Sequence, residues 1–296
     1  MRRVSTMLEE VTRELSSRGA AILNRIGQAS RGPSIPHPPR KPNCNPPLLE
    51  MNPDELLHFY QINDPIYQGL VRWRIESLQQ WKSAFISDCI RILEIGTGHF
   101  PFALALGPDT HQMEYVGVEP DPGFNERARL HVKDKFKNAA LHAQRWEERL
   151  IVEQGWRESF DVVCSFEVFE HVKAEERFIQ NACTVLRPGG FLILETPNAD
   201  VTPLFVKVFN HAPDGGGQYQ DVDHVNERGF RDLFQDIRKE GFEIIDFACY
   251  YLPVTLWDEK QIEPFQQQQL YQLIHRAAGQ FPFYSYAQMF LAQKKG

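Results

Sequence analysis

Five short apolar runs, separated by segments of helical spacing, constrain the fold of this 296-residue chain more than any other feature. Nearly continuous apolar runs of this length are typical of parallel strands that helices cover on both faces. The intervening segments, such as 122–136 and 176–186, repeat apolar side chains at helical intervals. This alternation predicts an α/β fold with a doubly wound sheet. The expected strands are 90–95, 114–119, 139–143, 160–166 and 190–196.

The C-terminal part is expected to complete the sheet with an antiparallel pair. A helical pattern over 226–240 leads into an apolar run at 241–251, and another run follows at 286–295. We expect these two runs to form an antiparallel edge, interrupted by a helical insert at 253–282. The stretch 199–225, which contains a glycine triplet and aromatic side chains, is predicted to form a substrate lid.

Three segments precede the main domain, which we expect to span 88–296. Residues 1–30 carry a basic amphipathic pattern that predicts a helix, and 31–52 form a proline-rich linker. Residues 53–87 have the pattern of a helical cap. The N-terminal helix could contact a membrane surface, pack on its own domain, or join two copies of the chain in a homodimer.

Composition excludes several classes of function. The formal net charge of −7 argues against a protein that neutralises many phosphates, so we do not expect a nucleic-acid partner. Five cysteines without a CxxC pair are typical of free thiols in a reducing compartment. No apolar run predicts a transmembrane helix, and the N-terminal residues lack the apolar core of a signal peptide. We therefore expect a cytoplasmic location.

The stretch LEIGTGHF places Gly96 and Gly98 where the first expected strand turns towards a helix. Glycine allows the backbone to approach a ligand closely. A dinucleotide-binding fingerprint would require a small residue where the chain has Pro101. Glu94, two residues before the first glycine, suits a ligand that carries an ammonium group. The loop therefore predicts a binding site for a small, partly cationic ligand.

Glu119 ends the second apolar run, in VGVEPD. A carboxylate at the carboxyl end of a strand can accept hydrogen bonds from both hydroxyls of a ribose. The alternative is a surface acid, although the run is apolar up to this position. We therefore predict that Glu119 binds a ribose.

These segments, together with FDVVCSFEVFEHV at 160–172 and LRPGGFLILETPN at 186–198, closely resemble class I S-adenosylmethionine-dependent methyltransferases. The motifs stand in the order and at the spacing of that family, between about residues 88 and 200. A departure is Phe100, where many members carry a third glycine. The resemblance implies a Rossmann-like seven-stranded methyltransferase sheet with helices on both faces and an antiparallel seventh strand. In this chain an N-terminal helical extension precedes that sheet.

The resemblance also implies how S-adenosylmethionine would bind. Its methionine part would lie on the glycine loop, its ribose on Glu119, and its adenine near the QRWEE segment. Phe166, at the end of the fourth expected strand, would also contact the cofactor. The residues assigned to the cofactor are Glu94, Gly96, Thr97, Gly98, Glu119, Trp146, Glu147 and Phe166.

The stretch SFEVFEHV follows the fourth expected strand and predicts the acceptor side of the active site. Glu167 and Glu170 are three residues apart and share a face if a helix has begun, with His171 beside them. Carboxylates and an imidazole can bind Mg²⁺, Mn²⁺ or Zn²⁺. His224, which follows Asp221 and Asp223, is a further candidate ligand.

This pattern resembles two subfamilies of methyltransferases. These are the ubiquinone-biosynthesis-type O-methyltransferases and the small-RNA 2′-O-methyltransferases, where a divalent metal would polarise the acceptor hydroxyl. In the alternative interpretation, the glutamates brace the loop or act with His171 as acid and base. His224 would then begin a helix. The candidate catalytic residues are His171, Glu170 and His224.

Other polar residues are less specific. Tyr60, Tyr67, Arg72 and Arg74 lie where related enzymes cover the cofactor, and an arginine could pair with its carboxylate. They could equally form a solvated helix face. His211, in the expected lid, is either a catalytic base or a surface histidine.

Three functions compete on this evidence. The sequence favours S-adenosylmethionine-dependent O-methylation of a small or mid-sized metabolite, with metal assistance left open. One alternative is RNA 2′-O-methylation, against which the negative charge argues. The other is a non-catalytic cofactor-binding partner protein, against which the intact glycine loop and Glu119 argue.

Overall fold

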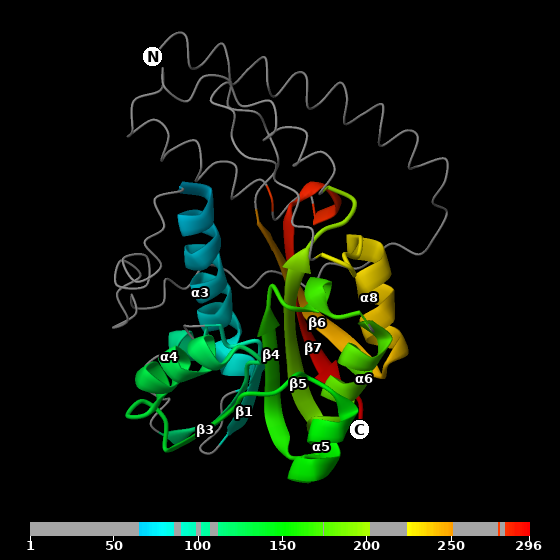
Figure 1. The fold of residues 1–296 in the computed structure, drawn as a ribbon. Coiled ribbons are helices and arrows are strands. Elements are labelled where there is room, and N and C mark those ends of the chain that lie inside the picture. Colours follow the sequence, from blue (N-terminus) through cyan, green and yellow to red (C-terminus); the bar gives the residue numbers. More distant parts are fainter. Residues whose placement is uncertain are drawn as a thin grey trace, which may run out of the picture. The chain divides into compact units, whose positions relative to one another are not determined.

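We describe a computed structural model of the chain, shown in Figure 1. All of the described residues lie within one compact unit that spans residues 45–296. They are residues 65–85, 90–98, 102–106, 112–173, 175–201, 224–250, 278 and 282–296.

A seven-stranded sheet in the order β3-β2-β1-β4-β5-β7-β6 forms the centre of the structure (Figure 1). The first five strands pair in parallel, whereas β7 runs antiparallel to both of its neighbours. The strands are β1 (Arg91–Ile95), β2 (Glu114–Val118), β3 (Asn138–His142), β4 (Phe160–Phe166), β5 (Leu186–Pro197), β6 (Phe242–Tyr250) and β7 (Ala287–Lys294).

Helices cover both faces of the sheet. Figure 1 shows α3 (Pro65–Phe85) and α4 (Pro122–Val132) on one face. The other face carries α5 (Glu148–Gln154), α6 (Glu175–Val185) and α8 (Phe230–Lys239). Short 3₁₀ helices complete the description: η1 (Phe102–Leu106), η3 (Phe169–His171) and η5 (Pro282–Tyr284).

Two apolar cores result from the alternation of side chains along the strands. In β1, Ile92 enters the core beneath α3, whereas Leu93 enters the core beneath α6 and α8. Because both faces are covered, the central strands β1, β2 and β4 are buried on both sides, which explains their continuous apolar pattern. Complete burial of a side chain such as Ile75 or Phe178 contributes about 1.5–3 kcal/mol to stability.

The expected α/β fold is confirmed, including the antiparallel seventh strand. The main difference lies in β5, which begins at Leu186 and not at Gly190. Leu186 pairs with Phe160, and the next pair joins Val162 to Phe191, so residues 187–190 loop out of the ladder. Gly189 has a φ of 78° in this loop, a conformation that glycine adopts without strain.

Several expected segments lie outside the described residues. They include the N-terminal helix 1–30, the linker 31–52, most of the lid 199–225 and nearly all of the insert 253–282. Within the expected cap 53–87, the structure describes α3. In the described part of the chain, no helix is both long and apolar enough to cross a membrane. Cys164, Cys183 and Cys249 are free thiols.

Candidate active site

The glycine loop after β1 has the backbone geometry that its sequence predicts. Gly96 has a φ of 73°, and its N–H donates to the carbonyl of Val118 over 2.7 Å. A Cβ atom at Gly96 would lie 2.1 Å from Cγ2 of Val168, so only glycine fits here. Gly98 has a φ of 53°, and a Cβ there would meet no atom of the described residues within 4 Å. The loop therefore packs against the segment after β4, and the described part of the chain leaves space at Gly98.

Glu94 lies below this loop and is buried. Its Oε2 accepts hydrogen bonds from the Tyr115 hydroxyl over 3.0 Å and from the Ala103 N–H over 3.2 Å. Glu94 thus connects the loop to β2 and η1. The predicted contact with the cofactor's ammonium group remains a prediction, and so does that of Thr97, which is also buried.

Glu119 lies directly after β2 and contacts the same loop. Its Oε2 accepts a hydrogen bond from the Gly98 N–H over 2.9 Å, and its Oε1 accepts one from the Asp121 N–H over 3.0 Å. A carboxylate oxygen has more than one acceptor site, so both oxygens can still accept from a ligand. The structure brings Glu119 and Gly98 together, as a shared cofactor site requires.

The residues expected near adenine differ in their surroundings. Trp146 is 8% exposed, and its ring lies 6.4 Å from that of Phe178 in an edge-on arrangement. Its Nε1 is buried without a hydrogen-bond partner in the described part of the chain. Glu147 is exposed at the start of α5, whereas Phe166 is buried at the end of β4. Their roles in cofactor binding remain predictions.

The segment after β4 does not begin with a helix. Glu167 adopts a left-handed conformation with a φ of 52°, and η3 begins only at Phe169. The helical spacing that would place Glu167 and Glu170 on one face is therefore absent. Glu170 is buried, whereas His171 is exposed.

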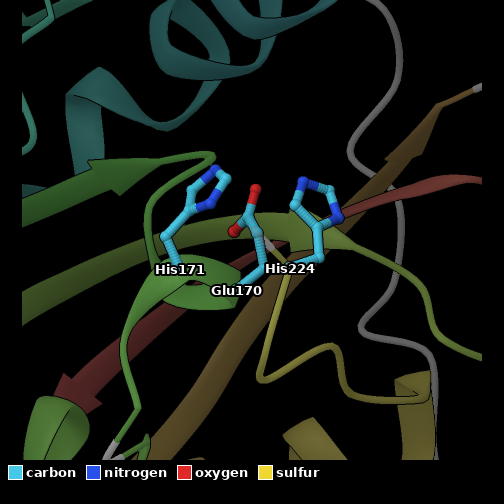
Figure 2. A group of neighbouring side chains, drawn as sticks. All are labelled: Glu170, His171 and His224. Atoms are coloured by element: carbon cyan, nitrogen blue, oxygen red, sulfur yellow. The ribbon is translucent and has the colours of Figure 1, made fainter. Parts of the chain in front are cut away.

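Glu170, His171 and His224 form the most distinctive cluster of the site. Their potential ligand atoms all lie within 4.8 Å of one another. The two rings are 4.8 Å apart and nearly perpendicular. Figure 2 shows the carboxylate of Glu170 between the rings of His171 and His224. Glu167, the fourth tentative ligand, lies outside this cluster of three.

The carboxyl group of Glu170 has one satisfied oxygen and one open oxygen. Its Oε2 accepts a hydrogen bond from the Thr196 hydroxyl over 2.8 Å. Its Oε1 is buried without a hydrogen-bond partner among the described residues. Burial raises the pKa of Glu170 well above its usual value, and the neighbouring charge of Glu167 raises this pKa further. A cation at the open oxygen would offset both effects.

His224 is oriented by a residue that the sequence did not indicate. Its Nδ1 lies 2.5 Å from Oε1 of Glu227. This contact leaves Nε2 as the ring nitrogen that can bind a ligand. The spacing of three residues between His224 and Glu227 is the signal from which the pair could have been found.

A buried ion network lies behind the cluster. Arg74 is 3% exposed, and its terminal nitrogen NH2 lies 2.9 Å from an oxygen of both Glu167 and Glu195. Burial raises the pKa of Glu195 to about 8, and the opposing charge of Arg74 only partly offsets this effect. The sequence indicated Arg74 as a candidate for the cofactor carboxylate but gave no reason to single out Glu195 or Thr196. Arg72, by contrast, is exposed on α3.

Seven residues named in the sequence analysis fall beyond what the structure describes. They are Tyr60, the side chain of Tyr67, Phe100, Pro101, His211, Asp221 and Asp223.

The sheet order, the glycine loop after β1 and the acid after β2 define the fold of class I S-adenosylmethionine-dependent methyltransferases. In comparison with known families, the model of the methyltransferase domain matches residues 63–248. This match covers more than half of the chain. The chain therefore belongs to the methyltransferase domain family.

Curated relatives share part of the sequence. The mitochondrial ubiquinone biosynthesis O-methyltransferase of Candida albicans is 26% identical over 210 residues, covering 66% of this chain and 61% of the relative. The ubiquinone biosynthesis O-methyltransferase of Rhizobium etli is 28% identical over 172 residues, covering 56% of this chain and 64% of the relative. The chain thus matches less than two thirds of the length of these two relatives.

Solved structures share the fold at low sequence identity. A putative sarcosine dimethylglycine methyltransferase from Galdieria sulphuraria superposes with a TM-score of 0.52 at 12% identity, covering 82% of this chain and 98% of the other. The [4+2]-cyclase SpnF superposes with a TM-score of 0.50 at 13% identity, covering 79% of this chain and 84% of the other. At this identity the likeness shows the fold alone.

Proposed function

We propose that this chain transfers the methyl group of S-adenosylmethionine to a hydroxyl oxygen of a small or mid-sized metabolite. We further propose that Glu170, His171 and His224 hold a divalent cation beside that oxygen. The grouping of these three side chains next to the cofactor loop is the observation that carries the proposal. The relatives from Candida albicans and Rhizobium etli, both named as O-methyltransferases of ubiquinone biosynthesis, favour oxygen as the methyl acceptor.

The position of the cluster supports methyl transfer. Gly96 packs against Val168, which lies between the end of β4 and η3, so the glycine loop adjoins the segment that carries Glu170 and His171. An acceptor held by these residues would lie near the methionine end of the cofactor. Placing the two reacting groups side by side contributes much of the rate enhancement of such a reaction.

The donor set fits a divalent cation. Two imidazoles and one carboxylate suit Zn²⁺ or Mn²⁺ better than Mg²⁺, which prefers oxygen ligands. The open Oε1 of Glu170 is a buried acceptor that needs a partner. The contact of His224 with Glu227 resembles the carboxylate support that metal-binding histidines usually have. Three protein ligands leave coordination positions free for the acceptor.

The chemistry follows from this arrangement. A bound cation supplies a Lewis acid that lowers the pKa of the acceptor hydroxyl. Because His171 would hold the cation and is exposed, the released proton would pass to the water beside it. The glycine loop and Glu119 would hold the methyl donor, while Arg74 and Glu195 support the segment behind the site.

A binding experiment tests the cation site first. Chelator-treated full-length protein is titrated with Mn²⁺, Zn²⁺ and Mg²⁺ in the presence of S-adenosylhomocysteine, and heat is measured by calorimetry. We expect about one tightly bound ion per chain, and we expect Glu170→Gln to abolish this binding. Glu243→Gln, an exposed position on β6, is the control and should bind as the wild type does. Absence of ion binding by the wild type would contradict the cation site.

A transfer experiment tests the acceptor. Labelled S-adenosylmethionine is incubated with the protein and a panel of substituted catechols, single phenols and an RNA oligonucleotide with a free 2′-hydroxyl. We expect labelled methyl ethers from catechols. Labelling of the RNA alone would favour RNA 2′-O-methylation, and no labelling of any acceptor would contradict the proposed reaction.

A further inference from the structure

We propose that Arg74 is a positioning residue for methyl transfer: its guanidinium joins Glu167 to Glu195 and thereby fixes the turn that directs Glu170 and His171 at the acceptor. This inference rests on the proposed function and extends it to a residue on α3, outside the family's glycine and acid motifs. Arg74 acts through other residues and is therefore not a catalytic residue.

The turn at Glu167 requires support. A φ of 52° is a conformation that side chains other than glycine seldom adopt. Glu158 shares a positive φ, but it lies in a turn at the surface. At Glu167 the main-chain N–H donates to the carbonyl of Glu195 over 3.2 Å, and the carboxylate lies 2.9 Å from Arg74. The main chain and the side chain of Glu167 are therefore both fixed by contacts.

Arg74 also supplies the cation in a cluster of three acidic residues. Two of these, Glu170 and Glu195, are fully buried, and Glu167 is partly buried. Without the guanidinium, the carboxyl groups of Glu167 and Glu195 would lose the group that lies 2.9 Å from an oxygen of each. Glu167, the more exposed of the two, would then turn towards solvent. The segment leading to η3 would move with it.

A chain of hydrogen bonds leads from Arg74 to the acceptor side. Glu195 is followed by Thr196, whose hydroxyl donates to Oε2 of Glu170 over 2.8 Å. The carbonyl of Glu170 in turn accepts the N–H groups of Val225 and Asn226 over 2.8 and 2.9 Å. Movement of either glutamate that Arg74 holds would therefore reach Glu170, His171 and the segment that carries His224.

Stability alone does not account for a buried arginine at this position. Arg74 lies within the buried face of α3, between Leu70 and Leu78. Buried ion networks often add little to stability compared with apolar side chains of similar volume, whereas removal of one partner leaves a buried charge unpaired. One terminal nitrogen of Arg74 meets both carboxyl groups, and the plane of the guanidinium fixes the directions of its N–H groups, whereas a lysine ammonium group rotates freely. These properties favour a role in geometry.

Three variants separate positioning from stability. Arg74→Met removes the cation, and Arg74→Lys keeps the charge without the planar geometry. The double variant Arg74→Met with Glu195→Gln also replaces the buried acid that the first variant leaves without its cation. Arg129→Met is the control, because Arg129 pairs with Glu126 on α4 at 52% exposure. Melting temperature, S-adenosylhomocysteine affinity, kcat, and KM for S-adenosylmethionine are measured on the full chain, with a catechol as acceptor.

We expect Arg74→Met to lower kcat by about tenfold or more while KM for S-adenosylmethionine changes less than about threefold, since one misplaced contact has effects of this size. Arg74→Lys should be intermediate. The double variant should regain melting temperature but not kcat. Arg129→Met should match the wild type. If the double variant regains kcat together with stability, or if Arg74→Met retains the wild-type kcat, the positioning role is wrong.

Amide hydrogen exchange gives a readout that needs no acceptor. Arg74→Met should accelerate exchange at Glu167, Val225 and Asn226, but not at Gly96, whose N–H bonds to Val118. Unchanged exchange at the first three amides would overturn the inference. If the wild type methylates no acceptor, the proposed function fails, and the exchange rates still decide whether Arg74 holds this turn. If Arg74→Met does not fold, the double variant and Arg74→Lys carry the same comparison.

Discussion

The main-chain N–H of Val225 donates a 2.8 Å hydrogen bond to the carbonyl oxygen of Glu170, and the next N–H, that of Asn226, donates to the same oxygen. Glu170 thus has two roles in the site. Its side chain faces the two histidines, and its main chain anchors the segment that brings His224 to them. The cluster therefore depends on backbone geometry as well as on side-chain chemistry.

The first prediction concerns the support of His224. Glu227→Gln should weaken Mn²⁺ or Zn²⁺ binding by about 10–100-fold, because carboxylate partners of metal-binding histidines contribute effects of this size. The contact of Glu227 with Nδ1 of His224 is the physical reason. Calorimetry on chelator-treated protein measures the change, with Glu243→Gln as the exposed control. Wild-type affinity in Glu227→Gln would show that Glu227 does not orient the ligand.

The second prediction concerns the glycine loop. Gly96→Ala should destabilise the fold and abolish S-adenosylhomocysteine binding, because a Cβ would overlap Val168. Gly155→Ala is the matched control, since Gly155 has a similar φ of 64° and its Cβ would meet none of the described residues within 4 Å. Gly155→Ala should lose only the cost of placing alanine in a left-handed conformation, about 1–2 kcal/mol in the free energy of unfolding.

A second substitution identifies the clash at Gly96 directly. Gly96→Ala combined with Val168→Ala should recover part of the lost stability, because the overlapping atoms are removed. Urea denaturation compares the variants. Equal loss in Gly96→Ala and Gly155→Ala would show that packing against Val168 is unimportant.

The third prediction concerns Glu119. Glu119→Gln should weaken S-adenosylhomocysteine binding by about 1.5–3 kcal/mol, the usual contribution of a hydrogen bond to a charged group. One of its oxygens accepts the N–H of Gly98 in the glycine loop, and the other accepts the N–H of Asp121 before α4, so Gln can satisfy only part of this arrangement. Glu126→Gln is the control, because Glu126 is an exposed residue on α4. Calorimetry with S-adenosylhomocysteine measures the difference, and equal affinity of all three proteins would refute the ribose assignment.

The fourth prediction concerns pH. Burial raises the pKa of Glu195 from 4.5 to about 8, so the folded state retains a proton that the unfolded state releases. The stability from this group is fully present below about pH 4.5 and is lost as the pH rises through 8. The free energy of unfolding of the wild type should therefore fall relative to that of Glu195→Gln, by at most about 1.4 kcal/mol per pH unit.

The comparison with Glu195→Gln isolates this one group. Burial lowers the pKa of both His131 and His142, so their stabilising effect is lost towards low pH, in the opposite direction. Because these histidines are present in both proteins, their contributions cancel when the free energies of unfolding of wild type and Glu195→Gln are subtracted. Urea denaturation from about pH 5 to about pH 8 provides the measurement. Parallel pH profiles would show that Glu195 is not protonated in the folded state.

The local parts of the site were predictable from the sequence. A glycine loop between a strand and a helix, and an acid at the end of the next strand, are neighbours because parallel strands end at one edge of a sheet. Gly98 and Glu119 are in hydrogen-bond contact for this reason. Likewise, His224 could be paired with Glu170 and His171, because both segments follow strands or precede helices at that same edge.

The ion network was not predictable in the same way. Arg74, Glu167 and Glu195 come from a helix and two strand ends that are far apart in the chain, and no short motif connects them. Glu195 follows an apolar run, and nothing in that run indicates that Arg74 is its partner. The positive φ of Glu167 was also hidden, because the residue pattern EVFEH is compatible with a helix start.

The position of β7 has a consequence for how the protein is made. β7 lies between β5 and β6, so these two strands join one sheet only after Ala287–Lys294 has been synthesised. Until then, the nascent domain presents two open strand edges, which are the surfaces through which chains aggregate. Because β7 follows both β5 and β6 in the chain, these two edges stay unpaired until its residues have left the ribosome.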